Sequence, residues 1–528
     1  MIRVSLLLLL LLHVPALAQG GSAGGAEDRF DLLRAAGVYT SALTFMSPRI
    51  LEPVPVPQLI AWGLNGIAAI DPRLRADLRD GRLRLRLIAP DRSEHVLLLR
   101  PAPNSADPAA WAREAAEIQS VAYNASPALR VSGTGGIVRG FFDEMFNHLD
   151  PYSRYTPPDE AEDDRTRRAG RAGVGITLAR RSGQIVVLTA PSDGPAAVEG
   201  VRAGDAILSI DGQETRGRDV ATVLGWLRGP EDTSVAVSWR GRDGKIRSAD
   251  LTRTLIPPET VRGELQGSVL VLRISDFNNA TGLRVSNEIE LRLREASRAS
   301  VPSQPVLTGI IIDLRGNRGG VLRQAVIAAD TILSPGVIAT TLGRDADATR
   351  ILRSTTGDLA PFVPVVVIVD GRTASAAEVL AAALADRGRA VVVGSTTLGK
   401  GLVQTIATLP DGGELRVTWS RILAPRGWPI QALGVMPQIC TSLGGEALAR
   451  QMDELAAGRA PMATALDRHH AARPPVTAQQ ALGLRASCPA AEGREADMRI
   501  ARLLVENPAG YAAALLPPLH DGTASVRP

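Results

Sequence analysis

The sequence is poor in the residues that build metal centres. Only two cysteines, Cys440 and Cys488, occur in 528 residues, and neither a C-x-x-C nor an H-E-x-x-H spacing is present. These spacings are the usual sequence signals of cysteine- and histidine-based metal sites. We therefore expect no metal, and no cofactor is required by the chemistry inferred below.

The chain also lacks a strong excess of one charge. Lys and Arg total 59 against 55 for Asp and Glu, and no basic block of the kind that marks a binding tail is present. This balance argues against a nucleic-acid-binding protein. With 45% hydrophobic and 22% charged residues, the chain is typical of a globular protein that is long enough for three or four domains.

Long hydrophobic runs are absent after the first residues. The chain begins with Arg3, a leucine run over Leu6–Leu12, and small residues at Ala16 and Ala18. The run is too short to span a membrane, so we interpret residues 1–18 as a secretory signal peptide cleaved after Ala18. The mature protein is then expected to be exported, periplasmic or extracellular, soluble, and peripheral to a membrane at most.

Export bears on the two cysteines. In an oxidising compartment Cys440 and Cys488 can pair, and closing their loop would contribute on the order of 4 kcal/mol in the chain-entropy model. The alternative is two buried thiols. The sequence contains nothing about the distance between them, so both interpretations stay open.

The stretch Pro364–Gln404 has the strongest pattern in the chain. Val365–Val369 is a short β-branched run that predicts a buried strand, and Ser375–Asp386 predicts a helix that stops before Gly388. Ser375 therefore lies in a strand-to-helix turn. Unpaired N–H groups at a helix start favour negative charge, so this is a candidate site for a nucleophile and its oxyanion.

None of the six histidines lies in this stretch, so the candidate base is Lys400, between two glycines. A lysine acts as a base when burial lowers its pKa. In the strand-like run that follows, Lys400, Leu402 and Gln404 share one face, which places the Gln404 amide to hold the lysine amine. Taken singly, a serine at a helix start is usually an N-cap, and a lysine between glycines is usually a solvated turn residue.

Three motifs occur together: IIIDLRGNRGG ending at Gly320, GRTASAAEVLAAAL around Ser375, and GKGLVQ around Lys400. In this order and spacing they resemble the C-terminal processing peptidases, or tail-specific proteases, which are serine proteases with a Ser/Lys dyad. The resemblance covers roughly residues 149–439. It implies Ser375 as nucleophile, Lys400 as general base and Gln404 as the residue that orients the lysine. It also implies an oxyanion hole formed by the N–H groups of Gly320 and Ala376.

The region around these motifs alternates strands with helices. Residues 267–274 and 309–314 predict buried strands, separated by a predicted helix over residues 281–298. Such alternation is typical of an α/β core with parallel strands. We expect a catalytic domain over residues 257–445, and the resemblance implies a core of the ClpP/crotonase-like type. We interpret Asp313 and Arg315 as a supporting charge pair.

Residues 170–256 resemble a PDZ domain. Gly173, Val174, Gly175 and Ile176 match the loop and strand that bind a C-terminal carboxylate in that fold. The physical basis is β-augmentation: a peptide end adds as a strand to a sheet edge while N–H groups of the glycine loop hold its carboxylate. The alternative is a PDZ domain that only packs against its neighbour.

The remaining segments carry weaker signals. Residues 27–160 are predicted to be mainly helical with one hairpin, whose strands are residues 83–89 and 95–100. Residues 446–528 form a predicted extension that is partly helical, with a disordered end after Pro518. The fold class is thus multidomain α/β and α+β, with a helical N-terminal region, a PDZ domain and an α/β catalytic core.

Together these features predict an exported serine endopeptidase that recognises the C-terminal tails of protein substrates. One alternative is a PDZ scaffold or chaperone that binds tails without cutting them. Another is an acyl-CoA hydratase-like enzyme, because that fold also uses glycine-rich oxyanion loops. The sequence leaves open the physiological substrate, whether the chain forms a homo-oligomer, and whether the site needs an adaptor or activator protein.

Overall fold

The computed structural model describes residues 29–191, 194–299 and 307–519. The predicted signal peptide, and all but Leu519 of the disordered end predicted after Pro518, lie outside these ranges. The chain divides into two compact units, residues 1–43 with 55–149 and residues 44–54 with 150–528. Over the described ranges, no helix combines the length and the apolar character that a membrane span needs. The domain boundaries expected from the sequence stay predictions.

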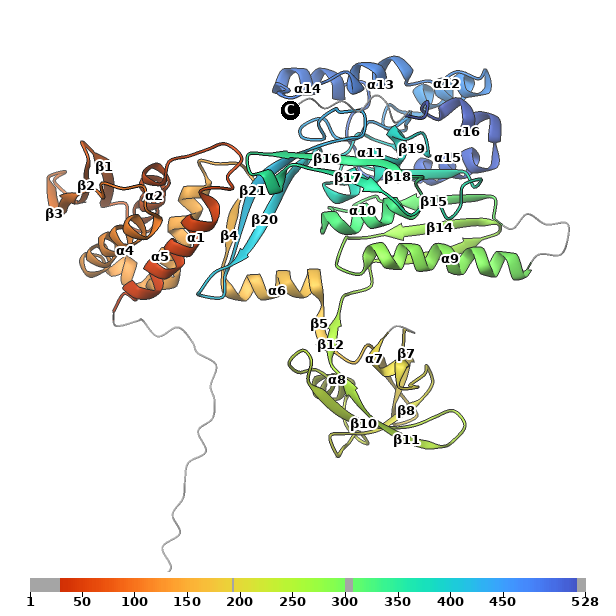
Figure 1. The fold of residues 1–528 in the computed structure, drawn as a ribbon, viewed down its shortest axis with the longest axis horizontal. Helices are drawn as coiled ribbons and strands as arrows, with labels where there is room; N and C mark the ends of the chain where they lie inside the picture. The colour runs from red at the N-terminus through yellow and green to blue at the C-terminus, as the bar shows by residue number, and fades with distance from the viewer. Residues whose placement is uncertain (1–28, 192–193, 300–306, 520–528) are drawn as a thin grey trace, which may run out of the picture. The chain divides into compact units, whose positions relative to one another are not determined.

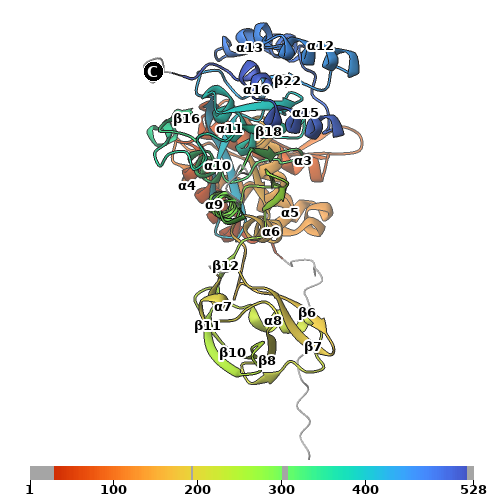
Figure 2. The same cartoon turned by 90° about the vertical axis from the view of Figure 1, so that its right-hand side faces the viewer.

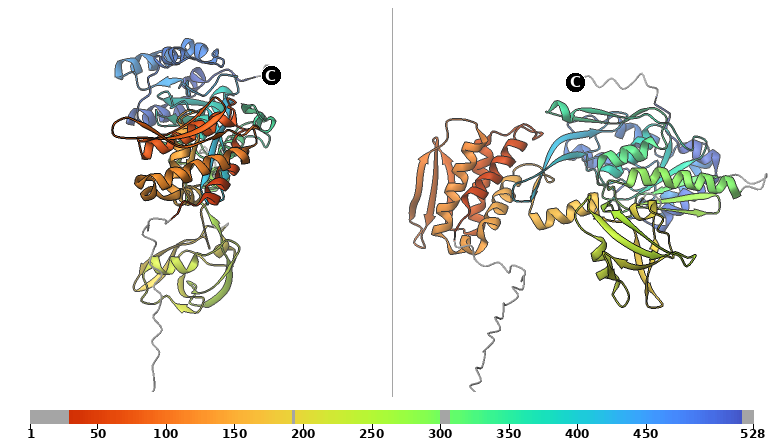
Figure 3. Two further views of the ribbon diagram at one scale, coloured as in Figure 1. Left: turned by 90° about the vertical axis from the view of Figure 1, so that its left-hand side faces the viewer. Right: turned by 60° about the horizontal axis from the view of Figure 1, so that its bottom comes forward.

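The N-terminal unit packs helices against a small antiparallel sheet (Figure 3). Its helices are α1 (Leu32–Met46), α2 (Val56–Leu64), α3 (Gly66–Ile70), α4 (Pro108–Ala125) and α5 (Pro127–Phe146). Its sheet has the order β1 (Leu74–Arg79), β2 (Arg82–Ile88), β3 (Glu94–Pro101). The sequence predicted only the β2–β3 hairpin. The strand that the sequence did not predict, β1, has only two buried positions, Leu74 and Ala76. In the sequence such a short alternation merges with the helix that ends before Pro72.

The second unit contains a six-stranded sheet in which all pairings but one are parallel. The order is β13 (Val261–Gln266), β14 (Val269–Ile274), β15 (Gly309–Asp313), β18 (Val365–Val369), β19 (Ala390–Gly394) and β22 (Ile439–Cys440), and only β13 is antiparallel to its neighbour. Every residue of β15, β18 and β19 is buried. Their continuous Val and Ile runs follow from this double burial, because both faces of a parallel sheet are covered.

Helices cover this sheet on both faces (Figures 1 and 2). One face packs against α9 (Thr281–Ala299), α10 (Leu322–Asp330) and α11 (Ala376–Asp386). The other packs against α12 (Gly445–Ala456), α15 (Glu495–Glu506) and α16 (Pro508–Ala514). The extension after residue 446 also carries α13 (Ala463–His470) and α14 (Ala478–Arg485), so it supplies one whole layer of the core.

A second, antiparallel sheet stands beside the first. Its order is β17 (Arg350–Ser354), β16 (Gly336–Gly343), β21 (Glu414–Leu423) and β20 (Leu402–Thr408), and the short β4 (Arg154–Thr156) also pairs with β21. The predicted hairpin over residues 401–423 corresponds to β20 and β21. Strand β20 begins two residues after Lys400, so this sheet positions the lysine loop.

The PDZ region forms its own sheet, entered through α6 (Pro158–Ala169) and the pair β5 (Arg171–Gly173) and β12 (Thr254–Ile256). The sheet order is β11 (Ile246–Thr252), β10 (Ser234–Arg240), β8 (Ala206–Ile210), β7 (Gln184–Thr189) and β6 (Thr177–Arg181), with β9 (Gln213–Glu214) on β8. Short helices α7 (Pro195–Val198) and α8 (Val220–Leu227) complete it. Among the described residues, strand β6 pairs only with β7, so its outer edge carries no neighbouring strand there (Figure 2).

The two cysteines form a disulfide. Cys440 at the end of β22 is bonded to Cys488, which lies 48 positions further along the sequence. The pairing that the sequence left open is therefore made in the structure, and it ties the C-terminal extension to the edge of the central sheet.

Candidate active site

The site begins with the turn that carries Ser375. Strand β18 ends before Asp370, and the Asp370 carboxylate accepts hydrogen bonds from the N–H groups of Arg372 and Thr373 at 3.0 and 2.9 Å. Ser375 then adopts φ 56° and ψ −119°. This conformation is strained for a residue with a side chain, and such strain persists only where the surroundings hold it. Helix α11 begins at the next residue, as the sequence predicted.

A glycine loop lies against this serine. A side-chain carbon at Gly319 would stand 2.7 Å from the Ser375 Cβ, and one at Gly320 would stand 2.1 Å from the Phe277 carbonyl oxygen. Both glycines have positive φ, 96° and 133°. The loop therefore needs glycine for conformation and for space. Buried Asn317 holds it, since its Oδ1 accepts the Gly319 N–H at 2.8 Å.

The two N–H groups expected to hold the oxyanion make no other hydrogen bond among the described residues. Over the described residues, neither the Gly320 N–H nor the Ala376 N–H donates to a protein acceptor. Ala376 is the first residue of α11, where N–H groups lack a partner within the helix. Free N–H groups next to a nucleophile are what an oxyanion hole requires.

A buried carboxylate joins the serine turn to the lysine loop. Glu378 is fully buried and accepts from the N–H of Ser375 at 2.7 Å, of Gly399 at 2.6 Å and of Lys400 at 2.9 Å. The Thr397 hydroxyl donates to it at 2.5 Å. Burial raises the pKa of the Glu378 carboxyl, and these donors act in the opposite sense. One side chain thus sets the distance between the backbones of the two predicted catalytic residues.

Lys400 lies in a half-buried position over an aromatic ring. Its Nζ is 4.7 Å from the centre of the Tyr152 ring. Burial lowers the pKa of the Lys400 amine below its ordinary value of 10.5, and the nearby cations of Arg154 and Arg416 lower it further. Asp150 and Glu378 oppose this shift. The environment therefore favours the neutral amine, the form that can accept a proton.

The two predicted catalytic side chains are not hydrogen-bonded to each other. Across the described ranges, no hydrogen bond joins Ser375 Oγ to Lys400 Nζ. The hydrogen bonds to Glu378 hold the backbones of the two residues in one unit. Catalytic hydrogen bonds are often long or unmade without substrate.

The orienting role of Gln404 stays a prediction. Its amide donates to the Leu402 carbonyl and to Thr418 Oγ1, both at 3.1 Å, and makes no hydrogen bond to Lys400 within the part of the chain that is described. The register of β20 on β21 shifts between Val403 and Gln404. Lys400 lies in the loop before β20, which begins at Leu402, so the strand alternation on which the shared face of Lys400 and Gln404 was predicted does not extend to the lysine.

Asp313 and Arg315 form the charge pair expected from the sequence. Two guanidinium nitrogens of Arg315 contact the Asp313 carboxylate at 2.8 and 2.9 Å, and Arg273 contacts it at 2.7 Å. Both partners sit at the end of β15, directly before the glycine loop. Arg315 also approaches Asp497 at 3.5 Å, which links this loop to α15.

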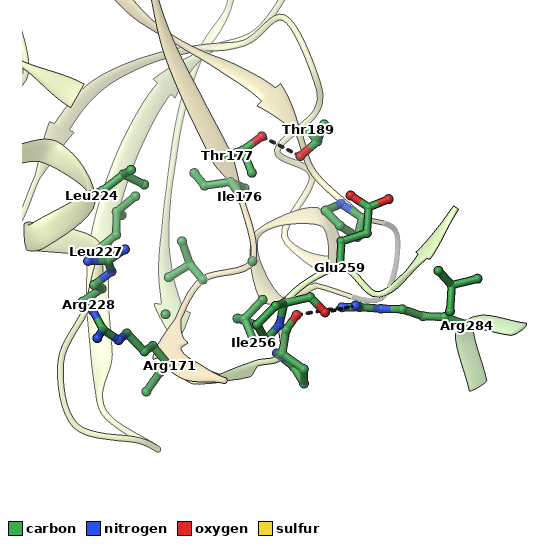
Figure 4. A pocket seen from close by; sticks show the side chains of 18 of the residues that line it. Arg171, Ile176, Thr177, Thr189, Leu224, Leu227, Arg228, Ile256, Glu259 and Arg284 are labelled. Atoms are coloured by element: carbon green, nitrogen blue, oxygen red, sulfur yellow. Dashed lines mark hydrogen bonds between the residues drawn. The ribbon is translucent and has the colours of Figure 1, made fainter. Parts of the chain in front are cut away.

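A groove of about 540 Å³ runs along the PDZ region, and Arg284, Asn287 and Leu291 of α9 line it as well (Figure 4). All four residues predicted to bind a peptide end, Gly173 to Ile176, line it. Leu224 and Leu227 line the groove from α8, and Ile176 and Thr177 line it from the β6 side. Over the described residues, the N–H groups of Gly175 and Ile176 have no protein acceptor. Arg171 and Arg228 add positive charge to the lining.

Sequence reasoning missed the residues that organise the site. Glu378 carried a signal, because Ser375 and Glu378 have the S-x-x-E spacing of a capping box. For Tyr152 and Asn317, no sequence signal distinguishes them from ordinary turn residues. No group of three His, Cys, Asp or Glu side chains that could hold a metal ion is present among the residues with described positions.

A strained serine beside free N–H groups, a lysine of lowered pKa and a groove with a free sheet edge define a class of protein, a serine peptidase with a PDZ domain. Comparison with known proteins agrees. The model of peptidase family S41 matches residues 268–441, and that of the PDZ domain matches residues 186–241.

Individual relatives carry the same description. The carboxy-terminal-processing protease of Bartonella bacilliformis is 32% identical over 306 residues, which cover 57% of this chain and 69% of that protein. The carboxy-terminal processing protease CtpA of Bacillus subtilis is 28% identical, with coverage of 58% and 64%. Among solved structures, the photosystem II D1 C-terminal processing protease is 29% identical, covering 61% of this chain and 85% of that one with a TM-score of 0.33.

The chain belongs to peptidase family S41, and it is a serine-type peptidase with a PDZ domain, similar to the carboxy-terminal processing proteases. It spans 69% and 64% of the length of the two curated relatives above.

The first prediction concerns Glu378. Replacing it in Glu378→Gln places an amide NH₂ among donors and removes the charge that holds them, so we expect kcat to fall by roughly tenfold to a hundredfold, with KM changed much less. Steady-state kinetics on a peptide substrate measure this. Gln480→Ala, which removes the N3 partner of the capping box of α14, is the matched control. An equal loss in both variants would contradict a special role for Glu378.

The second prediction concerns the pH dependence. The Arg416 cation lowers the pKa of Lys400, so Arg416→Gln should raise that pKa and the neutral amine should form only at higher pH. The rising limb of kcat/KM should therefore move to higher pH. Arg421→Gln on the same strand removes a cation whose ion-pair partner is Glu52, and we expect its profile to match the parent. An unshifted limb in Arg416→Gln would argue against Lys400 as the titrating base.

Proposed function

We propose that the protein is an exported endopeptidase that binds the C-terminal tails of protein substrates and cleaves them with Ser375 and Lys400. Neutral Lys400 takes the Ser375 hydroxyl proton as Oγ attacks the scissile carbonyl carbon. The Gly320 and Ala376 N–H groups hold the oxyanion. As the intermediate collapses, the Lys400 ammonium returns the proton to the leaving amine. Lys400 then deprotonates the water that hydrolyses the acyl-enzyme, and the serine is regenerated.

The observation that carries this proposal is the Glu378 contact set. Its carboxylate accepts from the N–H groups of both Ser375 and Lys400, so the nucleophile turn and the lysine loop are held as one unit. Burying a carboxylate is costly, and its donors offset that cost only while both loops keep this geometry. A binding scaffold without chemistry has no use for the spacing that it sets.

Gln404 keeps an indirect place in the proposal. Its partner Thr418 donates to Asp150 Oδ1 at 2.7 Å, and Asp150 is one of the charges that act on Lys400. A rotation of the Gln404 amide from Thr418 to the Lys400 amine would give it the orienting role that the family resemblance implies.

Tail recognition rests on the PDZ groove. Strand β6 has a free edge to which an extended peptide can add, and the unpaired N–H groups of Gly175 and Ile176 can take its terminal carboxylate. Leu224, Leu227 and Ile256 make part of the lining apolar, which favours a tail with an apolar last residue. The substrate segment upstream of the bound end would then extend toward Ser375.

Export is supported by the signal-peptide pattern of residues 1–18 and by the Cys440–Cys488 disulfide, a bond that is rare in reducing compartments. Cleavage assays of the mature protein with and without an added adaptor or activator protein would decide whether the site needs such a partner. Homo-oligomerisation and peripheral membrane contact are further parts of the proposed function, and oligomer-state and vesicle-binding measurements would test them.

The third prediction tests the dyad. The mature protein starting after Ala18 should cleave an unstructured protein with an apolar C-terminal tail, and Ser375→Ala and Lys400→Ala should each abolish cleavage while tail binding persists. Gel-based cleavage and tail-peptide affinity measure the two properties.

Cleavage that survives in Ser375→Ala would refute the proposed nucleophile. Tail binding without cleavage by any of the three proteins would favour the silent PDZ scaffold, and activity restored by an added partner would instead identify a resting state.

The fourth prediction tests the groove. Leu224→Glu places a charge in the apolar lining, so we expect affinity for an apolar tail peptide to fall by roughly tenfold or more while Ser375 chemistry on a short peptide is unchanged. Ile246→Glu is the matched control, since Ile246 is exposed on β11 at the opposite edge of the PDZ sheet. Fluorescence anisotropy of a labelled tail gives both affinities. Equal losses in the two variants would exclude this groove as the tail site.

A further inference from the structure

A short segment of the C-terminal extension contacts the turn before Ser375 and the loop before Lys400. We name Cys488–Arg494 the clamp segment. Its centre is Ala491, whose carbonyl oxygen accepts from the Gly371 N–H at 2.7 Å and from Ser395 Oγ at 2.8 Å. The Ala491 N–H donates to the same Ser395 oxygen at 3.1 Å. One residue of the extension thus hydrogen-bonds both to the turn before Ser375, which we call the nucleophile turn, and to the loop that leads to Lys400.

The contacts continue along the clamp segment. The Gly493 N–H donates to Asp370 Oδ2 at 3.3 Å, while Asp370 Oδ1 accepts from the turn that precedes Ser375. The Arg494 carbonyl accepts from Arg315 Nη1 at 2.9 Å. A side-chain carbon at Gly371 would stand 3.0 Å from the Ala491 nitrogen, so the fit against the turn is close.

Both ends of the clamp segment are anchored. At one end Cys488 is bonded to Cys440 on β22, and the Cys488 carbonyl accepts from buried Thr396 at 2.6 Å. At the other end the Arg494 N–H donates to Asp497 Oδ2 at 2.7 Å, where α15 begins. Ordering such an exposed loop costs conformational entropy, and a covalent anchor lowers that cost.

We propose that the clamp segment is a positioning element of the active site, and that the Cys440–Cys488 disulfide keeps it in register. The strained backbone of Ser375 persists only if neighbouring contacts hold it, and the clamp segment supplies hydrogen bonds to the turn before Ser375. Without the disulfide the segment loosens, the turn relaxes toward an unstrained conformation, and Oγ leaves its attacking position. This inference rests on the proposed role of Ser375.

The proposal makes activity sensitive to a dithiol reductant. Reduction by dithiothreitol transfers two electrons and two protons to the disulfide, which breaks the S–S bond and forms two thiols, while the reagent closes to a cyclic disulfide. Reoxidation by a disulfide reagent reverses the step. The enzyme would then be active only in an oxidising compartment.

The fifth prediction uses the full mature chain with Cys440→Ser and Cys488→Ser combined. We expect kcat on a short peptide to fall by roughly tenfold or more, with KM and tail-peptide affinity within about twofold of the parent. Hydrogen exchange of residues 370–376 should become faster, while that of the PDZ region should not change. Dithiothreitol should lower the activity of the parent and leave the double variant unaffected.

A second pair of variants keeps the test decisive if the double variant does not fold. Ser395→Ala removes the hydroxyl that bonds Ala491 and should also lower kcat and speed exchange at residues 370–376, whereas Ser395→Thr keeps the hydroxyl and should restore both. Ser487→Ala is the matched control, because the Ser487 hydroxyl makes no hydrogen bond to the described residues.

Unchanged kcat and unchanged exchange in the double variant, or in Ser395→Ala, would overturn the proposal. A parent protein without Ser375-dependent cleavage would instead refute the proposed function, and the exchange measurement would still decide whether the clamp segment holds the turn.

Discussion

The active site depends on one buried carboxylate. Glu378 is fully buried, and it accepts hydrogen bonds from the N–H groups of Ser375, Gly399 and Lys400. A carboxylate removed from water is stabilised only when its oxygens are filled by donors, so the loops that supply those donors cannot move independently. The requirement to satisfy Glu378 therefore converts two separate loops into one rigid frame.

That frame stands at the carboxyl ends of parallel strands. Strands β15, β18 and β19 end in the loops that carry the oxyanion glycines, Ser375 and Lys400. Parallel neighbours bring such loops to the same edge of the sheet, which is where α/β proteins place their sites. The C-terminal extension covers one face of this sheet through α12, α15 and α16 and reaches the same loops through the clamp segment. The C-terminal extension is thus a structural part of the catalytic domain's fold.

Much of the fold was predictable because its signals are local. The β-branched run of β18, the breaker-free α11 and the turn between them follow from composition over a few residues. The hydrogen bonds of the Gln404 amide were not predictable in the same way, because its partner Thr418 lies on β21, which only the fold brings alongside β20. Strand β1 was missed because its alternation is brief and follows directly on a helix.

The sequence by itself determined the chemical identities: a serine at a helix start, a lysine among glycines, a glycine-rich loop and a capping-box glutamate. These depend on residue type and short spacing, which a chain carries before it folds. Only the tertiary structure decided that the capping acid also holds the Lys400 backbone, that Tyr152 lies under the amine, and that Ala491 contacts the nucleophile turn. Such contacts join residues far apart in the chain, so they exist only after the sheet has brought its loops together.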